Sequence, residues 1–166
     1  MKTLLIPICL LFLSTGCSKD SPTSTEPPVP TLDITAKTNE GSLTIQRYDG
    51  ENWIDTADKL SVSRTWRFIS YTVYDRSVRI KGGYSLDMSN PSANDVVMSF
   101  RKLIFQDKDG IAIYEQPISL DGIEVNVRAN GTATISGTFY IILDNIDVSK
   151  QITRLVAPGP ASIPIE

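Results

Sequence analysis

From residue 31 onward, apolar and polar side chains alternate along the chain with a period of two. Residues 77–88 carry an apolar residue or a glycine at every second position, and residues 131–143 repeat this pattern. Alternation of this length predicts half-buried β-strands with one face in water. Gly137, in the middle of the second segment, predicts a bend or a close approach to the backbone. Shorter apolar segments predict further strands at 32–37, 42–48, 66–73, 111–113, 123–128 and 152–156.

Residues 95–106 change the parity of this pattern partway along. Phe100 ends one alternating set, and Leu103 and Phe105 belong to a second set with the opposite parity. A straight strand cannot hold both sets on one face. We therefore predict one extra residue, a β-bulge, near Arg101–Lys102, with all three apolar side chains pointing into the core.

Turn and helix signals fall between these segments. Residues 48–52 and the pair Asn130–Gly131 predict tight turns between strands. Residues 144–155 show only poorly phased helical character, so we predict one short turn there with Asp144 as its cap. Many short strands with almost no helix predict an all-β fold, either a sandwich or a barrel.

The N-terminal segment follows a different pattern. Lys2 precedes an apolar stretch from Leu4 to Leu13, and Ser-Thr-Gly then leads to Cys17. This is the layout of a secretory signal, and the stretch is shorter than the roughly 20 apolar residues that cross a membrane. It resembles a bacterial lipoprotein signal peptide, in which the cysteine after the small residues is lipidated. An ordinary secretory signal is the alternative.

The resemblance to lipoproteins implies a division of the chain into four parts. Residues 1–16 would be the signal peptide, and residues 17–30 the lipidated Cys17 with a tether rich in serine and proline. Residues 31–157 would form the β-sandwich domain, and residues 158–166 a flexible tail. The sequence Cys-Ser-Lys-Asp is similar to the start of surface-exposed lipoproteins of Bacteroidetes-type bacteria. The expected location is the cell envelope, lipid-anchored at the outer membrane.

Residues 78–143 carry a succession of motifs that implies a more specific fold. An Asn-Pro turn at Asn90–Pro91 is followed by a Val-rich strand, Asp95–Phe105, and by an Asp-x-Asp-Gly hairpin, Asp107–Gly110. This order resembles the immunoglobulin-like bacterial modules of the FxLYD type. The resemblance implies an immunoglobulin-like antiparallel β-sandwich of about seven to nine strands.

A second resemblance supports an alternative fold. Residues 59–75 are similar to the Trp-bearing first strand of lipocalin-like bacterial lipoproteins. The usual Gly-Thr-Trp of that strand is Arg-Thr-Trp here, with Trp66 as its tryptophan. This resemblance implies a lipocalin-like β-barrel that holds an apolar small molecule in its interior.

Composition narrows the possible functions. The formal net charge is −3 and no basic block is present, which argues against nucleic-acid binding. The chain has no histidine, and its two cysteines, Cys9 and Cys17, both lie in the N-terminal segment. A processed domain would therefore lack a disulfide, a cysteine nucleophile and the commonest transition-metal ligands. We expect no cofactor and no enzymatic activity.

Acidic residues are the remaining candidates for chemistry. A glycoside hydrolase needs two facing carboxylates, and Glu115, Asp121 and Glu124 are candidates that the sequence alone does not bring together. Asp107–Gly110 has the spacing of the start of a calcium loop. It lacks the further ligands and the bidentate glutamate of an EF-hand, so we predict a hairpin turn without a metal.

Aromatic residues are the candidates for a binding surface. Trp66 begins an apolar strand and is expected in the core. Trp53 follows a turn signal and is expected at the surface, where it would mark a binding site. These features predict an envelope-anchored lipoprotein whose non-catalytic β-sandwich binds a protein or a glycan. The alternative is a lipocalin-like carrier of an apolar small molecule.

Overall fold

The computed structural model describes residues 31–165, and the predictions for the signal peptide, Cys17 and the tether lie outside these residues. Among residues 31–165, no helix has the length and apolar content that crossing a membrane requires. The elements are, in chain order, β1 (Lys37–Tyr48), β2 (Trp53–Tyr74), β3 (Ser77–Ser89), β4 (Val96–Phe100), β5 (Lys102–Gln106), β6 (Ala112–Pro117), β7 (Ile123–Val127), β8 (Thr132–Leu143), the 3₁₀ helix η1 (Ile146–Gln151), β9 (Arg154–Val156) and β10 (Ala161–Ser162).

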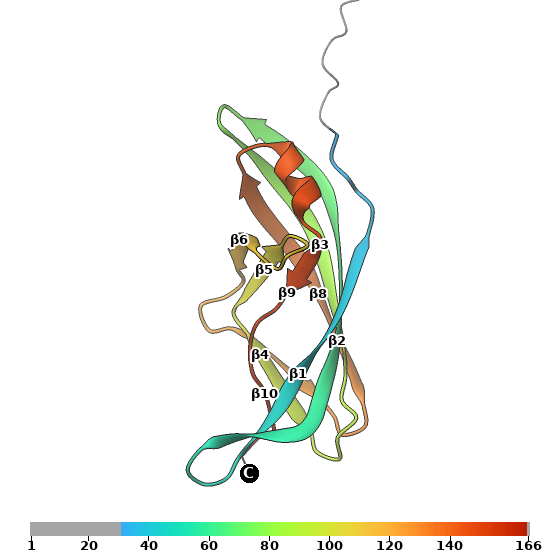
Figure 1. Cartoon of the computed structure of the whole chain (residues 1–166), viewed down its shortest axis with the longest axis vertical. Coiled ribbons are helices and arrows are strands. Elements are labelled where there is room, and N and C mark those ends of the chain that lie inside the picture. Colours follow the sequence, from blue (N-terminus) through green and yellow to red (C-terminus); the bar gives the residue numbers. More distant parts are fainter. Residues whose placement is uncertain (1–30, 166) are drawn as a thin grey trace, which may run out of the picture.

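Two sheets enclose the core (Figure 1). The larger has seven strands in the order β7-β4-β10-β1-β2-β3-β8 and is nearly closed, and the smaller has the order β6-β5-β9. Within the described residues, β1 and β10 are the one parallel pair, and the other paired strands are antiparallel. The predicted all-β fold is confirmed. It combines a second, smaller sheet with a barrel-like curvature of the larger one.

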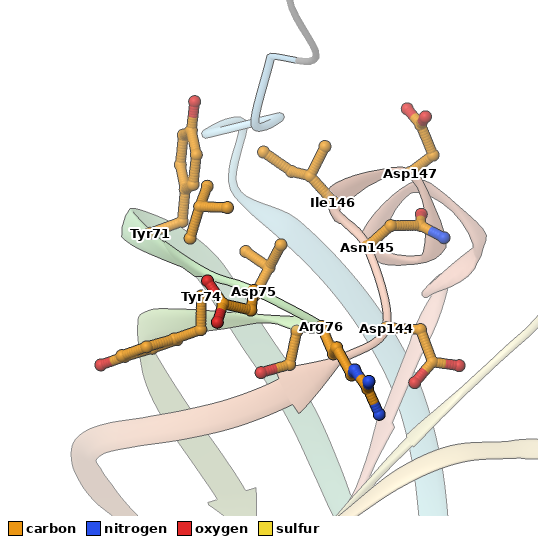
Figure 2. A pocket seen from close by; sticks show the side chains of 11 residues that line it. Tyr71, Tyr74, Asp75, Arg76, Asp144, Asn145, Ile146 and Asp147 are labelled. Carbon is orange, nitrogen blue, oxygen red and sulfur yellow. The ribbon is translucent and has the colours of Figure 1, made fainter.

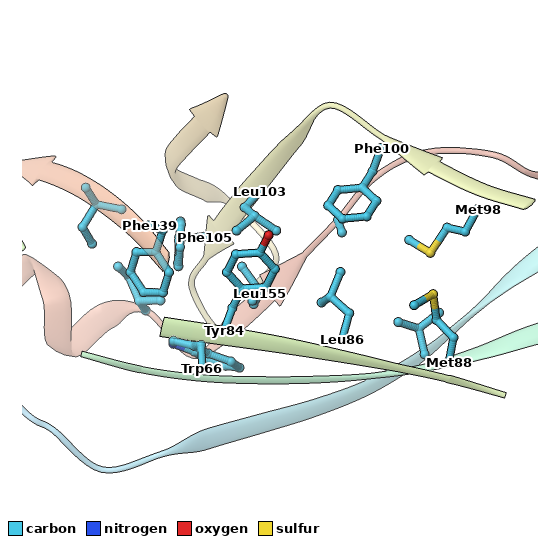
Figure 3. Packing of buried hydrophobic residues seen from close by; sticks show 14 of the residues in the cluster. Trp66, Tyr84, Leu86, Met88, Met98, Phe100, Leu103, Phe105, Phe139 and Leu155 are labelled. Atoms are coloured by element: carbon cyan, nitrogen blue, oxygen red, sulfur yellow. The ribbon is translucent and has the colours of Figure 1, made fainter. Parts of the chain in front are cut away.

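The core forms between the inner faces of the two sheets. Phe100, Leu103 and Phe105 are each at most 1% exposed, as the sequence predicts, and Trp66 is buried with them (Figure 3). Phe139 of β8 packs edge-on against Phe68, with ring centroids 6.2 Å apart, and against Phe105 at 4.7 Å. Burial of large aromatic side chains is the main stabilising contribution in a domain of this kind.

The parity change near Phe100 has a different cause from the predicted bulge. β4 ends at Phe100 in the large sheet, the chain bends at Arg101, and β5 begins at Lys102 in the small sheet. One residue between two strands shifts the parity as a bulge would, and the change of sheet keeps both apolar sets facing the same core. The predicted single strand 95–106 is therefore two strands.

Register irregularities occur elsewhere in the large sheet. One lies in β1 between Thr44 and Gln46, and the other lies in β2 between Phe68 and Ser70. A residue inserted into one strand reverses which side chains face inward beyond it. In β2 this reversal brings Tyr71 and Val73 beside Ile80 and Val78, on the inner side of the sheet.

Two glycines allow aromatic rings to lie against the backbone of the neighbouring strand. The ring of Phe139 occupies the space where a side chain at Gly82 would project. A Cβ added at Gly137 would lie 2.9 Å from the hydroxyl oxygen of Tyr84, so the predicted close approach at Gly137 is confirmed. Burial raises the pKa of the Tyr84 phenol.

The turn after β3 is fixed by one buried side chain. Asn90 donates from Nδ2 to the carbonyl oxygens of Asn94, Val127 and Arg128. Its Oδ1 accepts hydrogen bonds from the backbone nitrogen and the hydroxyl of Ser92. Because a buried amide is stable only when its polar atoms are paired, Asn90 holds the loop before β4 in one conformation.

Several element boundaries differ from those predicted. Residues 32–36 are not in a strand, whereas β1 runs without interruption from Lys37 to Tyr48. β2 begins at Trp53, 13 residues before the predicted start at 66. Asn145 rather than Asp144 caps η1, since Asn145 Oδ1 accepts a hydrogen bond from the backbone nitrogen of Val148 at 3.2 Å.

The prediction of a flexible tail at 158–166 is wrong for the part that the structure describes. Ala161–Ser162 form β10, which inserts between β1 and β4, and Ala161 is fully buried. The backbone of Ser99 donates to the carbonyl of Pro160, and a side chain at Gly159 would collide with the backbone of Ser99. The terminal segment therefore completes the large sheet.

Candidate functional site

A different hairpin lies at each of the two ends of the molecule (Figure 1). The described chain begins, at Thr31, at the end that carries the β2–β3 hairpin. The β1–β2 hairpin lies at the opposite end, where the C-terminal segment also ends. Each end presents one candidate binding site.

The first candidate is an aromatic pair at the β1–β2 hairpin. Tyr48 and Trp53 are directly opposed in the two strands, with ring centroids 5.6 Å apart and an angle of 52° between the planes. Trp53 is 46% exposed and Tyr48 39%. Two adjacent, half-exposed aromatic rings offer a flat apolar surface with polar edges, which suits a sugar ring or a protein side chain.

The turn between these aromatic residues is rigid. Asp49 Oδ1 accepts hydrogen bonds from the backbone nitrogens of Glu51 at 2.9 Å and Asn52 at 2.8 Å. These backbone donors hold the pKa of the Asp49 carboxyl below its ordinary value. Gly50 has a φ of 107°, which favours glycine. The turn thus fixes the hairpin register, which places Trp53 against Tyr48.

The second candidate is a cavity of about 400 Å³ between the β2–β3 hairpin and η1 (Figure 2). Its apolar and aromatic lining comes from Tyr71, Val73, Tyr74, Val78 and Ile146. Its polar lining is mainly charged and consists of Asp75, Arg76, Asp144 and Asp147, with Ser77 and Asn145. The cavity opens to the surface and lies beyond the packed core, so it is a pocket at the end of the sheet.

Local hydrogen bonds shape the η1 side of this cavity. The Ser149 hydroxyl donates to the carbonyl of Ile146 at 2.6 Å, and Lys150 forms an ion pair with Asp147 at 2.6 Å. With the Asn145 cap, these contacts account for the polar residues around 144–150 as parts of a short helix. Sequence reasoning missed the cavity because its two walls are about 70 residues apart in the chain.

The acidic residues considered for chemistry lie on different elements. Glu115 lies on β6 in the small sheet and is paired with Lys102 at 2.7 Å. Glu124 lies on β7 in the large sheet, and Asp121 lies in the segment between β6 and β7. Across residues 31–165, no group of three or more Asp, Glu, His or Cys side chains could hold a metal ion.

The Asp107–Gly110 segment forms the predicted hairpin turn. Asp107 Oδ1 accepts hydrogen bonds from the backbone nitrogens of Asp109 and Ile111, each at 2.9 Å. Gly110 has a φ of 82°, and its nitrogen donates to the Asp107 carbonyl at 3.2 Å. Asp107 Oδ1 therefore stabilises the turn by accepting two backbone hydrogen bonds.

One buried charge was not expected from the sequence. Arg64 lies on the inner face of β2 and donates from Nη1 to the carbonyl of Val62 at 3.3 Å. Its guanidinium fills the space beside Gly41, where an added Cβ would lie 2.6 Å from Nη1. Burial lowers the pKa of Arg64, Arg154 lowers it further, and Glu40 opposes this effect. The Arg64 guanidinium therefore occupies the space that a side chain at position 41 would otherwise need.

The chain is similar to solved structures at low sequence identity. No family model matches it, and no curated protein matches it. One similar solved structure is the Northeast Structural Genomics Consortium target SoR45, with 14% identity and a TM-score of 0.39; the match covers 52% of this chain and 64% of that chain. Another is a DUF1425 family member from Shewanella sp. pv-4, with 9% identity and a TM-score of 0.27; the match covers 60% of this chain and 87% of that one.

Proposed function

We propose that this protein is an envelope lipoprotein, anchored through Cys17, whose β-domain is a non-catalytic module that binds a protein or a glycan. The observation that carries the proposal is the exposed Tyr48–Trp53 pair at the end of the molecule opposite Thr31. A chain tethered to a membrane through residues 17–30 would present this hairpin away from its attachment. Tyrosine and tryptophan are also the residues most enriched in binding hot spots.

Two features support a binding role for this hairpin. The aromatic rings are held by a rigid turn, so binding would cost little conformational entropy. Neighbouring Ile54 is 38% exposed, and because successive side chains of a strand point to opposite faces, it adds apolar surface to the other face of the hairpin. The proposal also retains the FxLYD-type resemblance, in which the sandwich is a scaffold and its loops carry the binding surface.

Capture from detergent-solubilised envelope tests the proposed hairpin site. Wild-type protein, a Trp53→Ala variant and a Leu120→Ala variant serve as baits; Leu120 is 96% exposed in a loop and provides a matched loss of surface apolar area. We expect Trp53→Ala to lose the captured partner and Leu120→Ala to keep it. Equal capture by the two variants would contradict the site.

Fluorescence provides a direct readout of the same site. The chain has two tryptophans, so Trp66→Phe leaves Trp53 as the single reporter. Titration with a captured partner, or with oligosaccharides, should shift the emission of Trp53 because an exposed indole becomes buried. An unchanged spectrum with a ligand that binds by an independent assay would exclude Trp53 from the interface.

The anchor has its own test. Wild-type protein should incorporate labelled palmitate and partition into detergent, and Cys17→Ser should do neither. Cys9→Ser is the matched control, because Cys9 lies in the predicted signal peptide and should not affect labelling. Unlabelled wild-type protein in the aqueous phase would show that the N-terminal segment is an ordinary secretory signal.

The cavity favours a second candidate function, the carriage of an apolar small molecule. Most of the surface that lines it is apolar, although six polar residues border it, and its volume of about 400 Å³ suits such a ligand. An apolar fluorophore should then bind with one-to-one stoichiometry, and Val73→Trp should abolish binding by filling the cavity. Val73 is 65% exposed, so this change should leave the fold intact. Binding that survives Val73→Trp would place the fluorophore elsewhere.

A further inference from the structure

The outer face of the large sheet carries a basic-aromatic patch near the Thr31 end. The patch consists of Ile69, Tyr74, Arg79, Lys81, Tyr140 and Ile142. Strand register places these residues together: Arg79 is opposite Ile142, Lys81 is opposite Tyr140, and Tyr74 is opposite Ser77. The four uncharged members of the patch are between 39% and 53% exposed. Arg79 is also exposed, and Lys81 is partly buried.

The two cations of the patch have no carboxylate as cross-strand neighbour. The residues beside Arg79 are Thr72 and Ile142, and those beside Lys81 are Ser70 and Tyr140. None of the ion pairs found within residues 31–165 includes Arg79 or Lys81. Arg79 instead lies 4.4 Å above the centre of the Tyr140 ring, a cation–π geometry that fixes its guanidinium.

The surface around Arg79 is hollowed on two sides. Hollows of about 320 Å³ and 200 Å³ are both lined by Tyr74, Arg79 and Tyr140, and the smaller one also by Lys81. Each has several times the roughly 30 Å³ that one water molecule occupies. An anionic group could therefore approach both cations with aromatic rings on either side.

The rest of this outer face is mixed in charge, with Arg67 of β2 as a further exposed cation. Towards the β1–β2 hairpin it carries hydroxyl residues and the carboxylates of Asp87 and Glu40, which accept hydrogen bonds from Thr134 and Ser63. The carboxylates of Asp75, Asp144 and Asp147 line the end cavity between the hairpin and η1. The patch thus combines two cations with aromatic rings on one half of one face, while further cations such as Lys59 and Arg128 lie elsewhere on a chain whose net charge is −3.

We propose that the basic-aromatic patch rests on the anionic headgroups of the membrane that holds the lipid anchor. Tyrosine rings and the cationic side chains of arginine and lysine are the groups that favour a membrane–water interface. Cationic side chains near an anionic bilayer add to the hold of an acyl chain, which alone binds weakly. The patch adjoins the β2–β3 hairpin, at the same end of the molecule as the start of the described chain. The identity of the membrane depends on the proposed anchoring at Cys17. The charge and aromatic character of the patch do not depend on it.

Vesicle binding without the acyl anchor tests this surface. All core strands lie within residues 31–165, so the chain from Ser18 onward can be used as a lipid-free protein. We expect it to co-sediment with vesicles of phosphatidylglycerol and phosphatidylethanolamine but not with phosphatidylcholine alone. Binding should fall as salt rises from about 50 mM to 500 mM, because exposed charges are screened over a few ångströms at high salt.

Charge reversal assigns the binding to the patch. Arg79→Glu with Lys81→Glu should weaken the partition coefficient on anionic vesicles about tenfold or more. Lys59→Glu with Arg128→Glu makes the same change of net charge away from the patch and should reduce binding far less. Tyr140→Ser should also weaken binding, since it removes an interfacial ring and the support of Arg79. Circular dichroism and Trp66 fluorescence confirm that each variant is folded.

Three outcomes would overturn the proposal: no binding to anionic vesicles, equal loss in the two charge-reversal variants, or binding to a soluble anionic glycan without binding to vesicles. The last result would assign the patch to a glycan. None of them affects palmitate labelling at Cys17 or capture through Trp53, so failure of this proposal is distinguishable from failure of the proposed function.

Discussion

A methyl group added at Gly82 tests the packing at the centre of the core. Gly82 lies on the inner face of β3, opposite Phe139 of β8, and a Cβ at this position would overlap the Phe139 ring at several atoms. The ring cannot move aside freely, because Phe68 and Phe105 pack against it. Gly82→Ala therefore forces either the ring or the two strands out of place.

Overpacking of this kind costs about 1–3 kcal/mol, and a ring fixed on two sides favours the upper half of that range. For a domain of this size, each kcal/mol lowers the melting temperature by roughly 3–5 °C. We expect Gly82→Ala to lower it by about 6–15 °C. The neighbouring Gly83 is the control: its nearest atoms lie 3.7 Å from an added Cβ, so Gly83→Ala should be neutral or stabilising by up to about 1 kcal/mol.

A double-mutant cycle with Phe139 measures the clash between the two positions directly. Phe139→Ala alone should cost about 3–5 kcal/mol by leaving a cavity. In that background Gly82→Ala should become nearly neutral, because the added methyl group enters the vacated space. The coupling free energy should then be about 2 kcal/mol, obtained from guanidinium denaturation of the four proteins. Additive effects, or equal effects of Gly82→Ala and Gly83→Ala, would refute the proposed clash.

Three further outcomes are expected. Leu103→Asp should abolish the cooperative melting transition, because a fully buried position would receive an unpaired charge; a soluble variant that melts cooperatively would contradict this. Asp49→Ala should lower the melting temperature at neutral pH, and the difference from wild type should shrink as pH falls through the lowered pKa of Asp49, below its ordinary 3.8. Millimolar calcium should leave the melting temperature unchanged, since the turn already engages Asp107; a rise of several degrees that is lost in Asp107→Asn with Asp109→Asn would show a calcium site.

Period-two alternation was sufficient to predict most of the core. The inner positions of β3 are buried at every second residue from Val78 to Met88. The same pattern could not distinguish a bulge from a change of sheet at Arg101, because both insert one residue between two alternating sets. Only the pairing of β5 with β6 and β9 resolves this difference.

Elements that depend on tertiary contacts were missed. The first half of β2 contains Asp55, Asp58 and Lys59 and therefore lacks a strong alternating signal, yet it pairs along its length with β1. β10 has only two residues, and its place depends on pairing with β1 and β4 rather than on its own sequence. Tertiary pairing overrides local propensity in short strands.

The candidate sites also divide into one that local sequence predicted and others that depend on tertiary contacts. Trp53 was predicted at the surface from the turn before it, and it is exposed. The cavity could not be predicted, because it depends on the irregularity at Ile69. That inserted residue turns Tyr71 and Val73 inward and Ser70, Thr72 and Tyr74 outward. The cations of the patch follow the regular alternation of β3, and what the sequence did not show is the pairing that brings β8 beside them.

The two proposed surfaces are compatible in one orientation on a membrane. β1 has 12 residues, so at about 3.3 Å per residue the hairpin tip lies about 40 Å from the start of that strand. Contact through the basic-aromatic patch alone would tilt the domain, because the half of the outer face with Asp87 and Glu40 would be repelled by anionic headgroups. The Tyr48–Trp53 pair would then be raised from the surface and available to a partner. Quenching of Trp53 on vesicle-bound protein by an aqueous quencher, but not by lipid-attached spin labels, would support this orientation, and the reverse pattern would exclude it.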